Sequence, residues 1–268
     1  MSQTPSPWTI LMVEDNPLQR RELEAQLQPL GHRIVTAANG QEALDRMRTD
    51  TPDLVVLDAV MPTLDGFKTC QMLKGDPATA AVPIMVVTAL SRDAKERSYA
   101  AGADDFIRKP ANTVLLQVRV QTLLKVRALA LKGRELPAAR ARVLVVSASP
   151  LVRSQVQNHY GKQQAHYLEA QDETHARALI LAERPDVLVL DTDLLEGSAQ
   201  ALAVAIHQSE DLRGMPILLL HSPGELDLWS RLKEPVADVL EKPLVTQETR
   251  RRLALLVRLA QLQRHAPA

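Results

Sequence analysis

The stretch PDLVVLDAVMPTLDG, residues Pro52–Gly66, joins a short apolar run to an acid and a turn. Its segment Leu54–Leu57 predicts a buried strand that ends on Asp58. An acid at the carboxyl end of a parallel strand lies in the crevice where α/β folds place their chemistry. Because a lone buried carboxylate is costly to desolvate, we expect a metal ion, a lysine or both beside Asp58.

Around this stretch, the first half of the chain alternates apolar runs with amphipathic segments. Strands are expected at Trp8–Val13, Arg33–Ala37, Leu54–Leu57, Ile84–Val87 and Asp105–Arg108. Helices are expected at Leu18–Leu27, Gln41–Thr49, Gly66–Lys74, Ser91–Ala101 and Val114–Leu131. Five successive strand–helix units of this kind predict an α/β domain with a doubly wound, five-stranded parallel sheet.

The second half of the chain repeats the first in a fixed register. The matching pairs are Pro17 and Pro150, Asp58 and Asp191, Pro83 and Pro216, and Lys109 and Lys242. Each pair is separated by the same 133 positions, for example 191 − 58. So long a period indicates duplication of a whole domain. We therefore expect two consecutive (βα)5 domains, 8–131 and 141–262, joined by a linker at 132–140.

Composition and charge narrow the possible classes of function. The 268 residues carry 32 acidic and 32 basic side chains, a balance that disfavours general binding of polyanions. The arginines of 250–252, with Arg258 and Arg264, make one side of the last helix basic, and we interpret that side as solvated or packed rather than as a nucleic-acid surface. Cys70 is the single cysteine, and no signal peptide or membrane span is visible, so a cytoplasmic protein is expected.

The ends of the predicted strands bring a set of polar residues to one edge of the first sheet. This set is Glu14, Asp15, Asp58, Thr88 and Lys109. Clustered carboxylates favour a hard cation such as Mg²⁺, while a lysine and a hydroxyl suit a phosphate. An aspartate beside such groups can attack a phosphoryl donor. Taken singly, Thr88 is equally well explained as a cap and Lys109 as part of an ordinary loop.

These residues give 8–131 a resemblance to the receiver domain of two-component response regulators, which has a flavodoxin-like fold. The matching motifs are Glu14-Asp15, Asp58 in DAVMPTLDG, Thr88-Ala89 and Lys109-Pro110. The resemblance implies that Asp58 accepts a phosphoryl group from a histidine kinase or a histidine phosphotransfer protein. It also implies a Mg²⁺ site made by Asp15, Asp58 and the backbone carbonyl of Val60, with Glu14 acting mostly through water.

The same resemblance assigns the switching residues. Thr88 and Lys109 would hold the phosphoryl group, and Phe106 stands where the family carries its rotating aromatic residue, although a core role explains it as well. Val60 and Leu90 flank the expected site with apolar side chains. Because neither side chain can orient an attacking water molecule, slow loss of the phosphoryl group is expected.

The second copy has lost much of this set. In the common register, Ser147, Ala148, His221 and Val239 replace Glu14, Asp15, Thr88 and Phe106. Asp191 and Lys242 remain, and we expect a buried ion pair between them rather than an active site. Asp193 offers a partial substitute as a metal ligand, and His221 is interpreted as a surface loop residue. We therefore expect a receiver-like domain that is not phosphorylated in the usual way.

The order of the two domains resembles the input half of tandem-receiver diguanylate cyclases, in which the second receiver is a dimerisation adaptor. Their GG(D/E)EF catalytic domain has no counterpart in this sequence, so cyclase activity is not expected. The first hypothesis is a response regulator that forms a homodimer on activation and binds an unknown downstream protein. The alternatives are the regulatory part of a diguanylate cyclase-type regulator, a phosphatase using the DxD-like Asp191-Thr192-Asp193, and a phosphorylation-independent scaffold.

Overall fold

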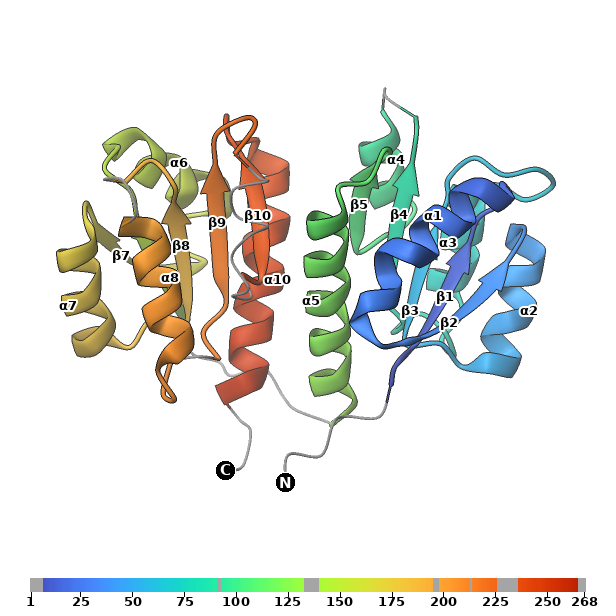
Figure 1. The fold of residues 1–268 in the computed structure, drawn as a ribbon, viewed down its shortest axis with the longest axis horizontal. Helices are drawn as coiled ribbons and strands as arrows, with labels where there is room; N and C mark the ends of the chain where they lie inside the picture. Colours follow the sequence, from blue (N-terminus) through green and yellow to red (C-terminus); the bar gives the residue numbers. More distant parts are fainter. Residues whose placement is uncertain are drawn as a thin grey trace. The chain divides into compact units, whose positions relative to one another are not determined.

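The computed structural model forms two compact units, Met1–Arg127 and Ala128–Ala268. It describes residues 7–90, 93–132, 140–194, 198–212, 214–225 and 236–264. Most of the expected linker, residues 133–139, lies outside the described residues, as does Ser91 at the start of an expected helix. Each unit has its own sheet and its own set of helices (Figure 1).

The first unit contains a five-stranded parallel sheet in the order β2-β1-β3-β4-β5. The strands are β1 (Thr9–Val13), β2 (Arg33–Ala37), β3 (Leu54–Leu57), β4 (Ile84–Thr88) and β5 (Asp105–Arg108). The helices are α1 (Pro17–Leu27), the short 3-10 turn η1 (Gln28–Leu30), α2 (Gly40–Asp50), α3 (Gly66–Gly75), α4 (Ala94–Ala100) and α5 (Thr113–Leu131). The expected α/β class and doubly wound topology are confirmed.

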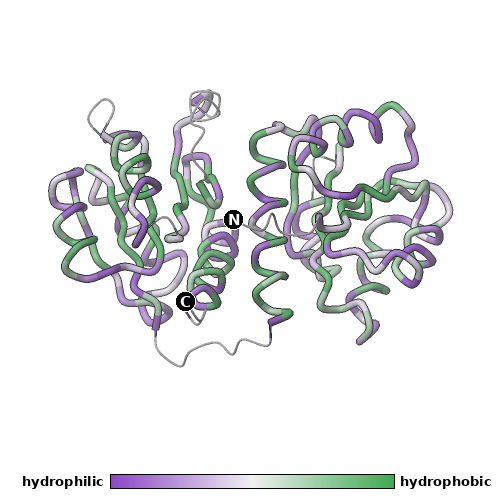
Figure 2. Tube along the Cα trace, turned by 60° about the horizontal axis from the view of Figure 1, so that its bottom comes forward, coloured by the Kyte–Doolittle hydropathy of each residue, from purple (hydrophilic) through white to green (hydrophobic). Residues whose placement is uncertain are grey.

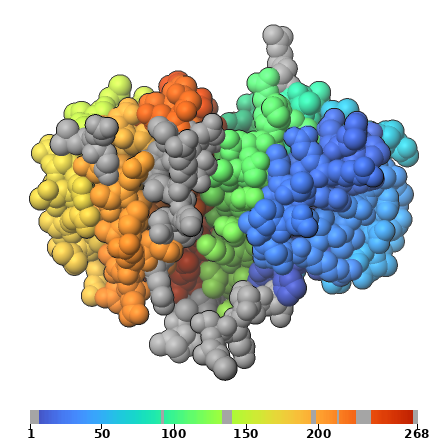
Figure 3. All heavy atoms as spheres, viewed as in Figure 1, coloured from blue at the N-terminus to red at the C-terminus, as the bar shows by residue number. Residues whose placement is uncertain are grey.

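The second unit repeats this topology, with the order β10-β9-β8-β6-β7. Its strands are β6 (Ala141–Val146), β7 (Ala165–Ala170), β8 (Val187–Asp191), β9 (Ile217–His221) and β10 (Asp238–Glu241). Its described helices are α6 (Pro150–Tyr160), α7 (Glu173–Glu183), α8 (Ser198–Gln208) and α10 (Thr246–Arg264). Helix α6 packs beside α10, and α7 packs beside α8. The atoms of α7 and α8, yellow and orange in Figure 3, lie side by side on the face that this view shows.

The cores of both units are built from aliphatic strands. Every residue of β3 and β8 is buried, as their uninterrupted apolar sequences predict for central strands covered on both faces. The hydropathy colouring of Figure 2 shows these central strands as hydrophobic, with mixed character along the helices. Cys70 is fully buried, and burial raises the pKa of its thiol to about 12, so it acts as a small hydrophobic residue.

Helix α1 shows how capping places a polar residue near the strand ends. The Asn16 side chain accepts hydrogen bonds from the backbone N–H groups of Leu18 and Gln19, and Pro17 occupies the first turn. Leu23 and Leu27 are buried as expected, but Leu18 is 75% exposed. Leu18 differs from Leu23 and Leu27 because it precedes Leu23 by five residues, which places it about 140° around the helix from the buried face.

Part of the basic side of the last helix is packed, which is one of the two states expected for it. Arg252 is only 2% exposed, and its Nη1 lies 3.3 Å from Asp238 Oδ2 on β10. Arg264 forms an ion pair with Asp186. Two of the five arginines therefore neutralise acids of the same unit. Among the described residues, no helix has the length and apolar character needed to cross a membrane.

Candidate functional site

Four strands of the first unit deliver the expected polar residues to one edge of the sheet. Backbone hydrogen bonds continue one residue past the strand ends: Glu14 N–H bonds to Ala37 O at 3.1 Å, and Asp58 N–H bonds to Val13 O at 2.9 Å. Likewise, Lys109 N–H bonds to the carbonyl of Thr88 at 2.8 Å. These bonds anchor the backbone of Glu14, Asp58 and Lys109 to the sheet.

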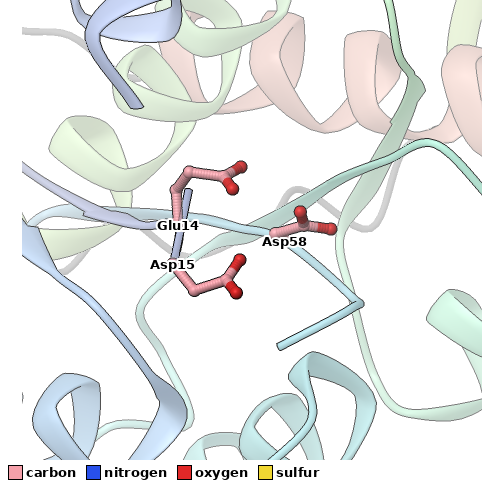
Figure 4. A group of neighbouring side chains, drawn as sticks. All are labelled: Glu14, Asp15 and Asp58. Atoms are coloured by element: carbon pink, nitrogen blue, oxygen red, sulfur yellow. The ribbon is translucent and has the colours of Figure 1, made fainter. Parts of the chain in front are cut away.

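Three carboxylates converge at this edge. Glu14, Asp15 and Asp58 each offer a ligand oxygen, and these oxygens lie within 4.8 Å of one another. Figure 4 shows Glu14 and Asp15 leaving the end of one strand, with their carboxylates extending toward Asp58. Glu14 and Asp58 are buried, whereas Asp15 is exposed. An all-oxygen set with one solvent-facing member fits a hard divalent cation such as Mg²⁺.

Lys109 neutralises part of this negative charge. Its Nζ lies 2.6 Å from Asp58 Oδ2 and 2.5 Å from Glu14 Oε2. Burial raises the pKa of the Glu14 carboxyl, while the hydrogen bond and charge of Lys109 act in the opposite direction. Lys109 is therefore not the ordinary loop residue that it could have been on sequence grounds.

The loop after β3 packs tightly against the backbone of Asp58. The N–H of Val60 donates to Asp58 Oδ1 at 3.1 Å, so both carboxylate oxygens of Asp58 have a partner. A Cβ on Gly66 would lie 2.0 Å from the carbonyl oxygen of Asp58. Only glycine fits at this position, which explains why the stretch Pro52–Gly66 ends in glycine. The Val60 carbonyl stays a predicted metal ligand.

Thr88 and Phe106 occupy positions consistent with more than one role. Thr88 is fully buried, and its hydroxyl accepts a hydrogen bond from Leu90 N–H at 3.3 Å within a local turn. Helix α4 begins later, with Asp93 at its N-cap position, so this bond does not cap the helix. Phe106 is half-buried against the core, and its carbonyl accepts from Arg119 Nη1 at 3.0 Å. Their part in switching stays a prediction.

Sequence reasoning missed Gln19. Its side-chain oxygen accepts the third hydrogen bond of Lys109 Nζ, at 2.7 Å. The only signal was its spacing: Gln19 follows Asp15 by four residues and so lies in the first turn of the helix beside the strand ends. Gln19 and Lys109 also line a cavity of about 300 Å³ between α1 and the loops that follow β4 and β5.

An aspartate held between a lysine and two further acids is equipped for phosphoryl transfer. Comparison with known proteins agrees with this chemistry, because the family model described as "Response regulator receiver domain" matches residues 10–121. Residues 10–121 are a response regulator receiver domain.

Similarity to other proteins extends beyond this receiver domain. The chain is 29% identical over 259 residues to the response regulator PleD of Caulobacter vibrioides, covering 89% of this chain and 56% of PleD. It is 42% identical over 118 residues to the probable transcriptional regulator ycf27 of Cyanophora paradoxa, covering 43% of this chain and 48% of that protein. The chain thus spans about half the length of these relatives.

The chain is also similar to a solved structure. The signal receiver domain of a signal transduction histidine kinase from Syntrophus aciditrophicus is 36% identical, with a TM-score of 0.43. The match covers 49% of this chain and 98% of that domain. The two five-stranded parallel sheets, together with the similarity to PleD, indicate tandem receiver domains.

The second receiver fold holds its strand-end acid differently. Asp191 Oδ1 accepts from Lys242 Nζ at 2.7 Å, which confirms the expected ion pair. Asp191 Oδ2 accepts from Ser147 Oγ at 2.6 Å, and Ser147 stands where the first receiver has Glu14. Within the described residues, no group of three metal-ligating side chains forms in this unit. Asp193 therefore does not complete a metal site there.

At this second site, His221 differs from what the sequence predicted, and Lys242 makes a contact in addition to the predicted one. His221 is only 3% exposed, because it is the last residue of the fully buried strand β9, so its interpretation as a surface loop residue is wrong. Lys242 also contacts Asp193 Oδ2 at 2.6 Å. Burial tends to lower the pKa of Lys242, but hydrogen bonds and charges from Asp191 and Asp193 outweigh it and raise that pKa.

Proposed function

We propose that this chain is a response regulator of a two-component phosphorelay, phosphorylated on Asp58 by a histidine kinase or a histidine phosphotransfer protein. The observation that carries this proposal is the contact of Lys109 with both Asp58 and Glu14 beside the exposed acid Asp15. A purely structural ion pair needs one acid for one lysine. Three converging acids are a surplus that suits metal-assisted phosphoryl chemistry.

The reaction requires little covalent chemistry from the protein. One carboxylate oxygen of Asp58 forms a bond to phosphorus while the bond from phosphorus to the donor imidazole nitrogen breaks, and the imidazole leaves with that electron pair. Lys109 stays beside the carboxylate and offers its positive charge to a phosphoryl oxygen. Mg²⁺ held by Glu14, Asp15 and Asp58 would add charge neutralisation at the phosphoryl oxygens.

Signalling follows from a change in protein association. A phosphoryl group on Asp58 would recruit the buried hydroxyl of Thr88 away from its bond with Leu90 N–H. Movement of that loop would allow Phe106 to repack, and the altered face would favour a homodimer or a downstream protein. The alternative is that the chain is the regulatory part of a diguanylate cyclase-type regulator. The similarity to PleD over 89% of this chain supports this alternative.

Phosphodonor labelling tests the proposal directly. With acetyl phosphate and Mg²⁺, the intact mass of the whole chain should gain one phosphoryl group, and the gain should vanish in Asp58→Asn and with chelator. Asp191→Asn is the matched control, since it changes the equivalent strand-end acid and should leave labelling intact. Sedimentation of the labelled chain measures association. Absence of any modification would favour the scaffold, whereas labelling that persists in Asp58→Asn would refute the assignment of Asp58.

A further inference from the structure

Asp193 makes three contacts around the second strand-end acid. Its Oδ2 accepts from Lys242 Nζ at 2.6 Å, and its Oδ1 accepts from Ser222 Oγ at 3.3 Å. Its backbone N–H donates to Asp191 Oδ1 at 3.2 Å. These contacts link the carboxyl ends of β8, β9 and β10, which are neighbours in the sheet (Figure 1).

The common register shows what these partners correspond to in the first receiver. Lys242 is the counterpart of Lys109, and Asp191 is the counterpart of Asp58. Ser222 follows β9 directly, so it offers its hydroxyl one residue beyond the position of Thr88. A phosphoryl group on Asp58 would be bonded to the acid and would face the lysine and a hydroxyl after the fourth strand. The Asp193 carboxylate faces this same combination of groups.

The counterpart of Asp193 itself is Val60, because 193 − 60 is again 133. Val60 has a backbone bond to Asp58, as Asp193 has to Asp191, but its apolar side chain leaves Lys109 to Glu14, Asp58 and Gln19. An acid at this position therefore gives Lys242 a second anionic partner. Its carboxylate also occupies the place that a phosphoryl oxygen would take.

The loop after β9 is tied to the same cluster by a further acid. Glu225 Oε2 accepts from Thr192 Oγ1 at 2.8 Å and from Ser222 N–H at 3.0 Å. Side chains thus connect the loop after β8 with the loop after β9 without any bound group. In the first receiver, the corresponding loop follows β4, where Leu90 N–H donates a hydrogen bond to the Thr88 hydroxyl.

We propose that Asp193 is a built-in substitute for a phosphoryl group, which prevents Asp191 from accepting one and holds residues 222–225, which follow β9, in a single arrangement. The second receiver is then fixed in one state, and the phosphorylation signal is confined to Asp58. The inference takes the proposed function of Asp58 as its reference, but its test does not need Asp58 to react.

Hydrogen exchange in the whole chain tests the hold on the loop. In Asp193→Asn, we expect residues 217–225 to exchange about threefold faster than in the wild type, since a carboxylate pair with Lys242 and Ser222 is lost. Asp211→Asn, another exposed acid of the same unit, is the control and should leave exchange unchanged. Equal exchange in Asp193→Asn and the wild type would overturn the proposal.

Grafting tests the block on Asp191. In an Asp58→Asn background, Ser147→Glu with Ala148→Asp restores the two missing acids, and Asp193→Val restores the residue of the first copy. Labelling by acetyl phosphate and Mg²⁺ should be about tenfold greater with Asp193→Val than without it. Equal labelling of the two grafted chains, whether strong or absent, would count against Asp193 as the block. The Asp58→Asn background separates this result from the fate of the proposed function.

Discussion

At the scale of single residues, the first site depends on how Lys109 distributes its three N–H groups. Two go to the anions Glu14 and Asp58, and the third goes to the neutral amide of Gln19. Phosphorylation would occupy an oxygen of Asp58, and a metal ion would compete with Lys109 for both acids, whereas the neutral amide of Gln19 changes in neither case. We therefore expect the Gln19 bond to keep Lys109 in place during the proposed reaction.

Replacement of Gln19 should slow phosphorylation without unfolding the domain. In Gln19→Met, Lys109 loses one of three partners, and the rate of labelling by acetyl phosphate should fall about tenfold. Gln26→Met is the matched control, because Gln26 lies on the same helix, lines the same cavity and bonds to Ala111 O rather than to Lys109. A similar loss in both variants would mean that general support of the loop, not the Gln19 bond, sets the rate.

The place of the proposed reactive residues at the edge of the sheet could be predicted from sequence, but their exposure and second partners could not. Asp58 and Lys109 each follow a recognisable strand, so their place at the sheet edge follows from the topology. The burial of His221 follows from the length of β9, whose last residue it is, and the pattern after the apolar run did not mark that end. The contact between Gln19 and Lys109 joins residues 90 positions apart and leaves no local pattern.

At the scale of elements, the junction of β3 and α3 fixes the direction of the reactive carboxylate. Asp65 caps α3 by accepting from Lys68 N–H at 2.8 Å, and Gly66 N–H bonds to Ala59 O at 3.0 Å. The first residue of α3 is thereby held in direct contact with the backbone of Asp58. No space remains for a side chain at Gly66.

Gly66→Ala should damage both stability and phosphorylation. The added Cβ would meet Asp58 O and the Ala59 backbone, so we expect a loss of about 3 kcal/mol in the free energy of unfolding. Gly75→Ala, at the other end of α3, has no atom within 4 Å of the added Cβ and should change stability by less than about 0.5 kcal/mol. Urea unfolding with acetyl phosphate labelling measures both effects. Equal stability of the two variants would contradict the steric argument.

Elements differed in how well the sequence predicted them. Strand β3 was predicted residue for residue because its apolar run is bounded by Pro52 and Asp58. Helix α4 is described as Ala94–Ala100, shorter than the expected segment, since polar sequence alone does not mark its start. The arginines of α10 looked alike in sequence, yet Arg252 turns inward because Asp238 on β10 requires a partner.

At the scale of the whole molecule, one topology carries two different sites. Both sheets have the same strand order and the same lysine after the last strand. The first unit keeps surplus acids around that lysine, whereas the second surrounds it with Asp191 and Asp193 and places Ser147 on the remaining oxygen. Duplication has preserved the scaffold, while substitutions at a few strand ends have changed the chemistry.

Removal of the second lysine should destabilise the second unit. Lys242→Met would leave the buried carboxylate of Asp191 without its cation, at a cost of about 3 kcal/mol near pH 7. Because the folded-state pKa of Lys242 is raised above 10.5, this contribution is complete below that pH and is lost as pH rises through the raised value. Urea unfolding at pH 7 and at alkaline pH, with Lys132→Met as a control, measures the contribution of Lys242 to the free energy of unfolding. If the wild type and Lys242→Met unfold alike at pH 7, the prediction is refuted.

The cluster at Glu14, Asp15 and Asp58 also has a consequence for electroneutrality. Three carboxylates and the single ammonium of Lys109 leave an excess of two negative charges, which is the charge that one divalent cation cancels. In the second unit, the two carboxylates that contact Lys242, those of Asp191 and Asp193, leave an excess of only one, and Glu225 bonds to Thr192 and Ser222 instead of the lysine. A divalent cation would bring the groups around Lys109 to neutrality but would leave those around Lys242 with a net positive charge, so we expect divalent cations to act more strongly on the first unit than on the second.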